Sequence, residues 1–236
     1  MDSWQDGALH AGFEERLDEL LAKFLPRWQD PSRPLDPDEA AVSARRRRDK
    51  RALLAAQLRE QRARAVELAE PLLHAVVHDE DESLNRQLVE PLVEVVGRRR
   101  VQTHLIQTVA WGHPHLKVCA VRAWHWSQVT LVYDSDEALL DGRPTAASRL
   151  ADDRVADLRG WYRAACLEAF VTTEHAPTRD WLARGFLLDE GHYLPDQHHL
   201  VIQARAIAEA DPGRYLALLT RTEDGTSLAS FRSADD

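Results

Sequence analysis

The feature that most constrains this chain is a short helical pattern that returns four times. Each copy begins with an apolar residue, often followed by a basic one, and places a small or apolar residue four positions later. The copies start at Leu84, Leu116, Tyr162 and Leu200. Residues three or four positions apart share one face of an α-helix. Because one helix pair cannot bury such a face alone, the recurrence predicts helix pairs that stack on one another.

The clearest copy lies within residues 114–124. Leu116, Ala120, Ala123 and Trp124 recur at helical intervals, so they are expected on one buried face. Alanine at the middle positions lets a second helix approach to the usual separation of about 8–10 Å. Trp161 is also expected on a buried face. The two cysteines, Cys119 and Cys166, fall on buried positions of the copies and are expected as small core residues.

The pattern resembles the HEAT repeat, a family whose unit is a pair of antiparallel helices with an aspartate near the end of the first and a Val-Arg-x-x-Ala core in the second. The first copy departs from that core, with Asn85 at the arginine position and Leu88 at the alanine position. The residues that carry the resemblance are Pro71-Leu72-Leu73, Val76-Val77, Asp79, Leu84-Asn85 and Leu88; Leu116-Lys117, Ala120 and Ala123; Tyr162-Arg163, Cys166 and Ala169; and Leu200-Val201, Ala204 and Ile207.

We therefore predict an all-α fold, a right-handed α-solenoid of about four HEAT-like helix pairs with an N-terminal helical extension. An ordinary helical bundle with alanine-rich faces is the alternative. The predicted organisation is an N-terminal helix and Pro-rich linker over residues 1–37, the repeat domain over 38–221, and a polar tail over 222–236.

Apolar periodicity and breaker residues set the expected helices. The first carries the apolar stripe Phe13, Leu17, Leu20, Leu21 and Phe24. Pro71 is expected to break the long second segment, because proline removes a backbone hydrogen bond. Residues 134–153 are expected to form a long break with one helical turn near 137–140. The helices are predicted at residues 12–24, 39–78, 84–96, 101–111, 116–132, 155–172, 178–187, 197–209 and 212–220.

Composition indicates a soluble globular protein, with 44% hydrophobic and 29% charged residues. The chain has no apolar run of about 18 residues, so we expect no membrane span. Its first residues, Met1-Asp2-Ser3-Trp4, do not resemble a signal peptide, and a cytoplasmic location is expected. The net charge of -9 makes a nucleic-acid partner unfavourable, since affinity for nucleic acid depends on neutralised phosphates.

Positive charge is nevertheless concentrated in two stretches, residues 45–64 and residues 98–100. Residues 45–64 hold nine basic residues against two acidic ones, whereas residues 79–82 are all acidic. A solvated helix with internal salt bridges and a site for an acidic partner both fit the first stretch. The predicted basic patch comprises Arg45, Arg46, Arg47, Arg48, Lys50, Arg51, Arg98, Arg99 and Arg100.

No residue pattern indicates catalysis. The eleven histidines lack metal-ligand spacing, so neither a metal nor a cofactor is expected. Asp152-Asp153 with Asp157 does not match a metal-binding aspartate motif. The sequence also lacks a Gly-rich phosphate loop and a nucleophile elbow.

The expected function is that of a non-enzymatic protein-binding scaffold or adaptor, because solenoids offer a long concave surface. Its partner would be another protein. Two alternatives stay open. One is a DNA alkylpurine glycosylase of the HEAT-like class, which the segment Trp161-Tyr162-Arg163-Ala164-Ala165 loosely resembles. The other is an immunity or regulatory partner of a basic effector protein, which the acidic balance suits. The predicted binding surface comprises Lys117, Arg122, His125, Trp126, Arg159, Arg163 and Gln203.

Overall fold

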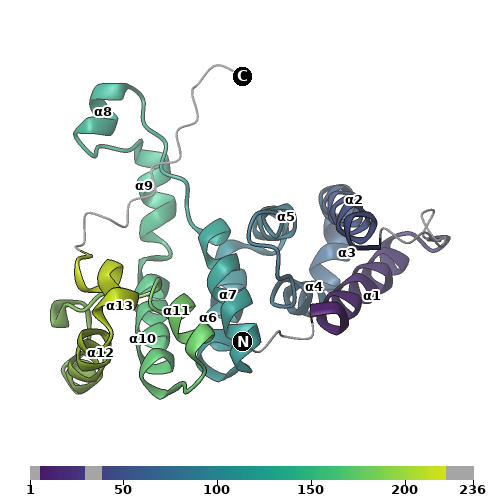
Figure 1. Ribbon diagram of the computed structural model, residues 1–236. Helices are drawn as coiled ribbons and strands as arrows, with labels where there is room; N and C mark the ends of the chain where they lie inside the picture. Colours follow the sequence, from purple (N-terminus) through teal and green to yellow (C-terminus); the bar gives the residue numbers. More distant parts are fainter. Residues whose placement is uncertain (1–5, 30–38, 222–236) are drawn as a thin grey trace. The chain divides into compact units, whose positions relative to one another are not determined.

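A computed structural model describes residues 6–29 and 39–221 (Figure 1). Every regular element in these ranges is helical, which confirms the all-α prediction; the solenoid remains a prediction. The α-helices are α1 (Asp6–Phe24), α2 (Glu39–Glu60), α3 (Arg62–Glu67), α4 (Ala69–Val76), α5 (Arg86–Val96), α6 (Arg98–Trp111), α7 (Pro114–Ser127), α8 (Asp136–Leu140), α9 (Ala146–Asp153), α10 (Ala156–Thr172), α11 (Ala176–Leu182), α12 (His198–Ala210) and α13 (Pro212–Leu219). Two short 3-10 helices, Glu190–His192 and Pro195–Gln197, precede α12.

The chain divides into two compact units. Unit 1 comprises residues 1–105 and 122–127, and unit 2 comprises residues 106–121 and 128–236. The boundary falls within α6 and α7. The predicted linker, with its prolines at 31, 34 and 37, and the predicted polar tail lie outside the described residues.

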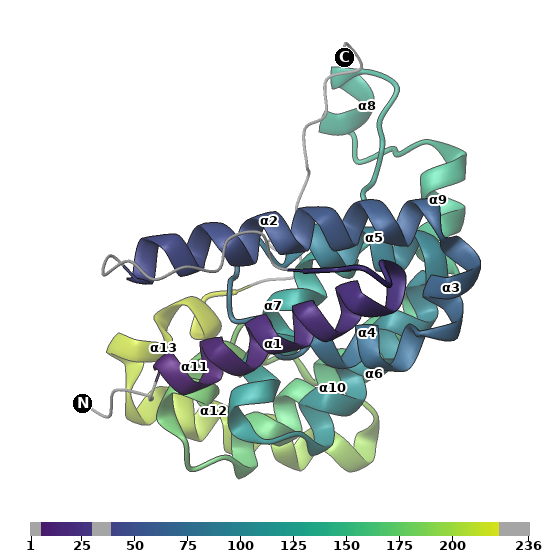
Figure 2. The same cartoon turned by 90° about the vertical axis from the view of Figure 1, so that its right-hand side faces the viewer.

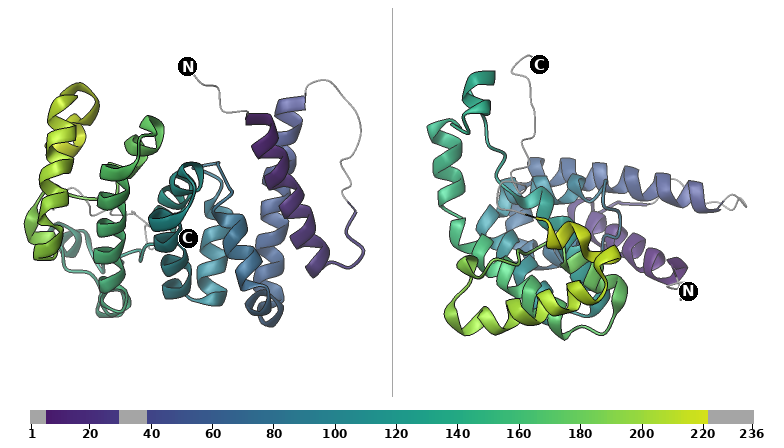
Figure 3. Two further views of the ribbon diagram at one scale, coloured as in Figure 1. Left: turned by 90° about the horizontal axis from the view of Figure 1, so that it is seen from below. Right: turned by 60° about the vertical axis from the view of Figure 1, so that its left-hand side comes forward.

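Unit 1 is built around α2, which packs against both α1 and α5. Figures 2 and 3 show α1 and α2 running side by side. The predicted stripe of α1 is buried at every position from Phe13 to Phe24, and Leu54 and Leu58 of α2 are buried as well. Burying a leucine or phenylalanine side chain stabilises a fold by about 1.5–3 kcal/mol, so this interface is a principal part of the unit 1 core.

Unit 2 is centred on α10, which packs against α11 and α12, while α12 also packs against α13. Phe170 of α10 lies at the centre, with its ring 5.0 Å from that of Phe186 and 5.5 Å from that of Tyr215. Both cysteines are buried and free, as predicted. Burial raises the pKa of Cys166 to about 12, so this thiol stays neutral and serves as a small core side chain.

Two predictions about helix ends are wrong. The segment expected as one helix from 39 to 78 is three helices, which are separated at Gln61 and Leu68 rather than at Pro71. Pro71 lies in the first turn of α4, where the backbone N–H has no helical partner and its loss costs little. By contrast, α5 continues through Pro91 and ends at Val96, where the predicted helix over 84–96 also ends; Gly97 follows it with φ 92°.

The prediction that Val129–Tyr133 completes a helix is also wrong, because α7 ends at Ser127. β-branched residues in this stretch disfavour a helix. The carbonyl of Val132 instead accepts hydrogen bonds from the backbone N–H of Thr145 and from the hydroxyl of Ser148. Trp161 is a further correction: it is 56% exposed, whereas its neighbour Tyr162 occupies the buried stripe of α10.

Candidate functional site

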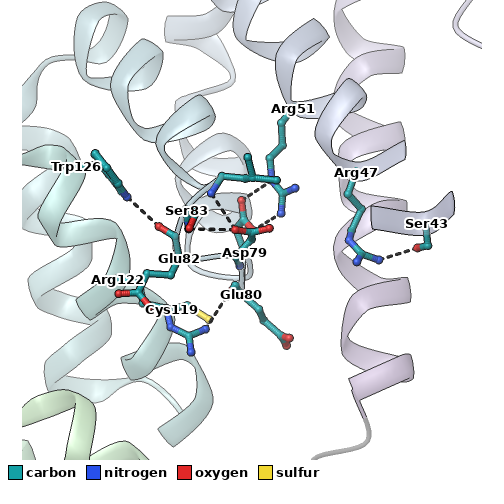
Figure 4. A network of polar contacts seen from close by, with 12 residues as sticks. Ser43, Arg47, Arg51, Asp79, Glu80, Glu82, Ser83, Cys119, Arg122 and Trp126 are labelled. Carbon is teal, nitrogen blue, oxygen red and sulfur yellow. Dashed lines mark hydrogen bonds and ion pairs between the residues drawn. The ribbon is translucent and has the colours of Figure 1, made fainter. Parts of the chain in front are cut away.

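The acidic turn after α4 is the centre of the polar network in unit 1 (Figure 4). Asp79 is fully buried and accepts a hydrogen bond from the backbone N–H of Asp81 at 3.1 Å. Asp81 in turn accepts from the N–H groups of Ser83 and Leu84 through its Oδ1 atom, at 3.0 and 2.9 Å. These side-chain bonds to the backbone fix the turn and lead the chain into α5.

Arg51 of α2 holds this turn from the opposite side. Its Nε and Nη2 atoms donate to the two carboxylate oxygens of Asp79 at 2.7 and 2.5 Å. Both side chains are almost completely buried, and the guanidinium also lies over the ring of Phe13, 4.9 Å from the centroid. Burial raises the pKa of Asp79, while Arg51 opposes this shift. A buried pair with bidentate geometry is satisfied internally, so its role here is structural.

A cavity of about 290 Å³ lies beside this pair, entirely within unit 1. Arg47 borders it from α2, four residues before Arg51, and Arg122 borders it from α7. Arg47 donates to the hydroxyl of Ser43 at 2.6 Å, and Arg122 donates to the carbonyl of Glu80 at 2.6 Å. Among the residues that the structure describes, its lining consists of Phe13, Arg47, Arg51, Asp79, Glu80, Asp81 and Arg122, and we call it the arginine pocket.

Two further residues of the predicted binding surface lie next to this turn. Trp126 donates from Nε1 to the carbonyl of Glu82 at 3.1 Å, and Arg86 lies over its ring at 5.4 Å. His125 is exposed and meets Trp126 edge to face, with 4.5 Å between ring centroids. Trp126 is therefore half-buried against the acidic turn rather than directed into solvent.

The predicted basic patch is dispersed over different environments. Lys50 is buried, and its Nζ atom binds Glu14 and Asp18 of α1 at 2.9 and 2.8 Å. Lys50 and Arg51 are thus both paired with carboxylates from other elements. This differs from the predicted solvated helix, whose salt bridges would lie within the helix itself. Elsewhere on α2, Arg45 and Arg48 are exposed, and Arg46 and Arg47 are half-buried. On α6, Arg98 donates to the Ser127 carbonyl, Arg99 is exposed, and Arg100 binds Glu70 at 2.7 Å.

The other predicted binding residues belong to unit 2. Lys117 was expected to be exposed, but it is half-buried and donates to the carbonyls of Val109 and Ala110 at 2.5 and 2.9 Å. It satisfies the last carbonyls of α6, and burial lowers its pKa. Arg159 binds Asp152, and Arg163 is half-buried, whereas Gln203 is exposed on α12.

The break predicted over residues 134–153 is an excursion over residues 132–153 that carries α8 and α9, and we call it the arm. Val132 is tied to the start of α9, because Thr145 donates to its carbonyl at 2.7 Å and its own N–H bonds the Ser148 hydroxyl at 3.2 Å. The ends of the intervening loop are thus held together, as in a compact Ω-type loop. Figure 1 shows α8 standing away from the other helices of unit 2.

The two helices of the arm bury little and carry exposed apolar side chains. None of the residues of α8 is buried, and Leu140 is 87% exposed; in α9 only Ser148 is buried, and Leu150 is 54% exposed. The predicted helical turn near 137–140 is confirmed, but α9 was not expected. Its N-cap signal is Thr145, which accepts from the N–H of Ser148.

Among the described residues, no group of three or more His, Cys, Asp or Glu side chains is arranged to hold a metal ion. The helices in the same ranges are all too short or too polar to cross a membrane. No protein-family model, curated protein or solved structure matches the chain.

Proposed function

We propose that this chain is a non-enzymatic protein-binding module and that the arm of unit 2 is the surface that contacts the partner. The observation that carries the proposal is the exposure of Leu140, 87%, on a helix that buries none of its residues. An exposed leucine side chain does not stabilise the fold of this chain. Burying it against another protein would gain about 1.5–3 kcal/mol.

The caps at the two ends of α8 support the same proposal. Ser135 caps its N-terminus by accepting from the N–H of Ala138 at 3.1 Å. At the other end Gly142 adopts φ 61°, and its N–H bonds the carbonyl of Leu139 at 3.0 Å. The helix is therefore held by its own caps rather than by packing on the core. A preorganised element loses less conformational entropy on binding.

Charge indicates the kind of partner. Residues 132–153 hold six acidic residues against two basic ones. Asp134, Asp136 and Glu137 are exposed next to Leu140. Complementary charge favours a partner with a basic surface around an apolar depression. The acidic arm therefore also fits the alternative that this chain is a regulatory partner of a basic protein. The HEAT-like repeats would then serve as the scaffold that carries the arm.

Affinity capture from cells that produce the protein tests this proposal. We expect wild-type protein to retain a basic protein and Leu140→Ser to lose it, because the central apolar contact is removed. Leu216→Ser is the matched control, since Leu216 is also in unit 2 and is 60% exposed outside the arm. Equal retention by Leu140→Ser and wild type would overturn the proposal, as would an acidic partner.

A further inference from the structure

The arginine pocket of unit 1 is lined by charged groups of both signs. Arg51 and Asp79 form its floor and satisfy one another through two hydrogen bonds. The cavity wall then offers two guanidinium groups, Arg47 and Arg122, and two carboxylates, Glu80 and Asp81. Figure 4 shows Arg122 and Glu80 beneath the acidic turn, with Arg47 across from them on α2.

The guanidinium of Arg47 has unused hydrogen-bonding capacity. It carries five N–H donors, and among the described residues its hydrogen bond is to the hydroxyl of Ser43. Arginine binds carboxylates with two parallel hydrogen bonds, so Arg47 is suited to a ligand carboxylate. Arg47 is half-buried, so water screens its positive charge less than it would screen a fully exposed charge. This strengthens its attraction to a ligand carboxylate.

On the other side of the cavity, Asp81 is held with one oxygen toward the backbone. The backbone N–H groups of Ser83 and Leu84 both bond to Oδ1, which orients the carboxylate and, within the described part of the chain, leaves Oδ2 for another donor. An ammonium group carries three such donors. The carboxylates in the lining thus disfavour a simple anion and the guanidinium groups disfavour a simple cation, whereas a ligand with one group of each sign satisfies both.

Size and wall chemistry narrow the ligand further. A cavity of about 290 Å³ is at the lower end of the range of about 300–1,000 Å³ for small-molecule sites. Phe13 is the one apolar side chain among the described residues that line it. We propose that the arginine pocket binds a small zwitterion of the free α-amino-acid class, with its carboxylate at Arg47 and its ammonium at Asp81.

Calorimetric titration of the full chain with L-alanine, L-leucine and L-phenylalanine tests this inference. We expect saturable binding of at least one of them. For leucine, the matched probes are 4-methylpentanoate, which lacks the ammonium group, and 3-methylbutylamine, which lacks the carboxylate. The corresponding deaminated and decarboxylated compounds serve for the other two amino acids. Each probe with one charge is expected to bind at least tenfold more weakly than its parent amino acid.

Variants separate the pocket from nonspecific charge effects. Arg47→Gln and Asp81→Asn should each weaken binding of the amino acid at least tenfold, and the asparagine retains an oxygen for the two backbone N–H groups. Arg48→Gln is the control, because it removes the same charge from an exposed neighbour on α2. Circular dichroism melts show whether each variant is folded. Absence of saturable binding, equal binding of the anionic probe, or unchanged affinity in folded Arg47→Gln would overturn the inference.

Discussion

Removing Asp79 should destabilise unit 1 severely, because Arg51 would remain as an unpaired buried cation. The guanidinium is 2% exposed, so water cannot replace the two hydrogen bonds it makes to the carboxylate. Breaking a buried pair from one side costs about 3–5 kcal/mol. Asp79→Ala is expected within this range, with a further loss of about 1 kcal/mol from the N–H of Asp81.

The reciprocal variant, Arg51→Met, should cost less, and its cost should depend on pH. Arginine cannot release its proton, whereas a buried carboxyl can become neutral. Burial raises the pKa of Asp79. Without Arg51, the carboxylate of Asp79 therefore takes up a proton as the pH falls, and the unpaired buried charge disappears. The deficit of Arg51→Met relative to wild type should therefore shrink as the pH falls from 7 to 5.

The assay is urea unfolding followed by circular dichroism at 222 nm for wild type, both single variants and the double variant. The double variant removes both charges, so we expect it to lose at least about 2 kcal/mol less than the sum of the single losses. Arg48→Met is the control and should lie within about 0.5 kcal/mol of wild type, because Arg48 is exposed. Additive single losses, or a loss below about 1 kcal/mol for Asp79→Ala, would refute the structural role of the pair.

Three further outcomes follow from packing and burial. Ala120→Leu should destabilise by about 1–3 kcal/mol in a urea melt, because Ala120 is fully buried and the added atoms overpack the core. Gly185→Ala should also destabilise, since the new Cβ would meet the Cys166 sulfur at 2.4 Å, whereas Gly160→Ala, with open space around it in α10, should stabilise by up to about 1 kcal/mol. Burial lowers the pKa of His104, so its folded form resists protonation; stability should fall as the pH drops below about 6.5, and His104→Gln should reduce that fall in melts at pH 7.5 and 5.5.

The helical class and much of the core follow directly from periodicity. The stripe from Phe13 to Phe24 was predicted from spacing alone, because each residue three or four positions on returns to the same face. The buried positions Ala120 and Ala123 were predicted for the same reason. Trp161 was misplaced because it lies at the edge of such a stripe, where spacing does not separate a buried face from an exposed one.

The polar network could not be predicted in the same way. Arg51 belongs to a stretch of basic residues that looks solvent-exposed in sequence, and its partner Asp79 lies 28 positions further along the chain. No local pattern connects the two, since their pairing depends on the packing of α2 against α5, the helix that follows the acidic turn. The arginine pocket was missed for this reason, although Arg47, Arg51 and Arg122 were each named as candidates.

Arg51 and Leu140 are opposite exceptions to the usual distribution of polar and apolar residues. A buried arginine is costly, but Asp79 offsets that cost within the same unit, so structure alone accounts for it. Leu140 has no such compensation, because α8 buries nothing and is held by Ser135 and Gly142 through backbone caps. Single exposed apolar side chains are common on protein surfaces, but Leu140 lies on a helix that its caps preorganise and that buries none of its residues, which suits it to a contact outside the chain. For that reason we propose protein binding for the acidic, apolar arm rather than for the basic stretch of α2.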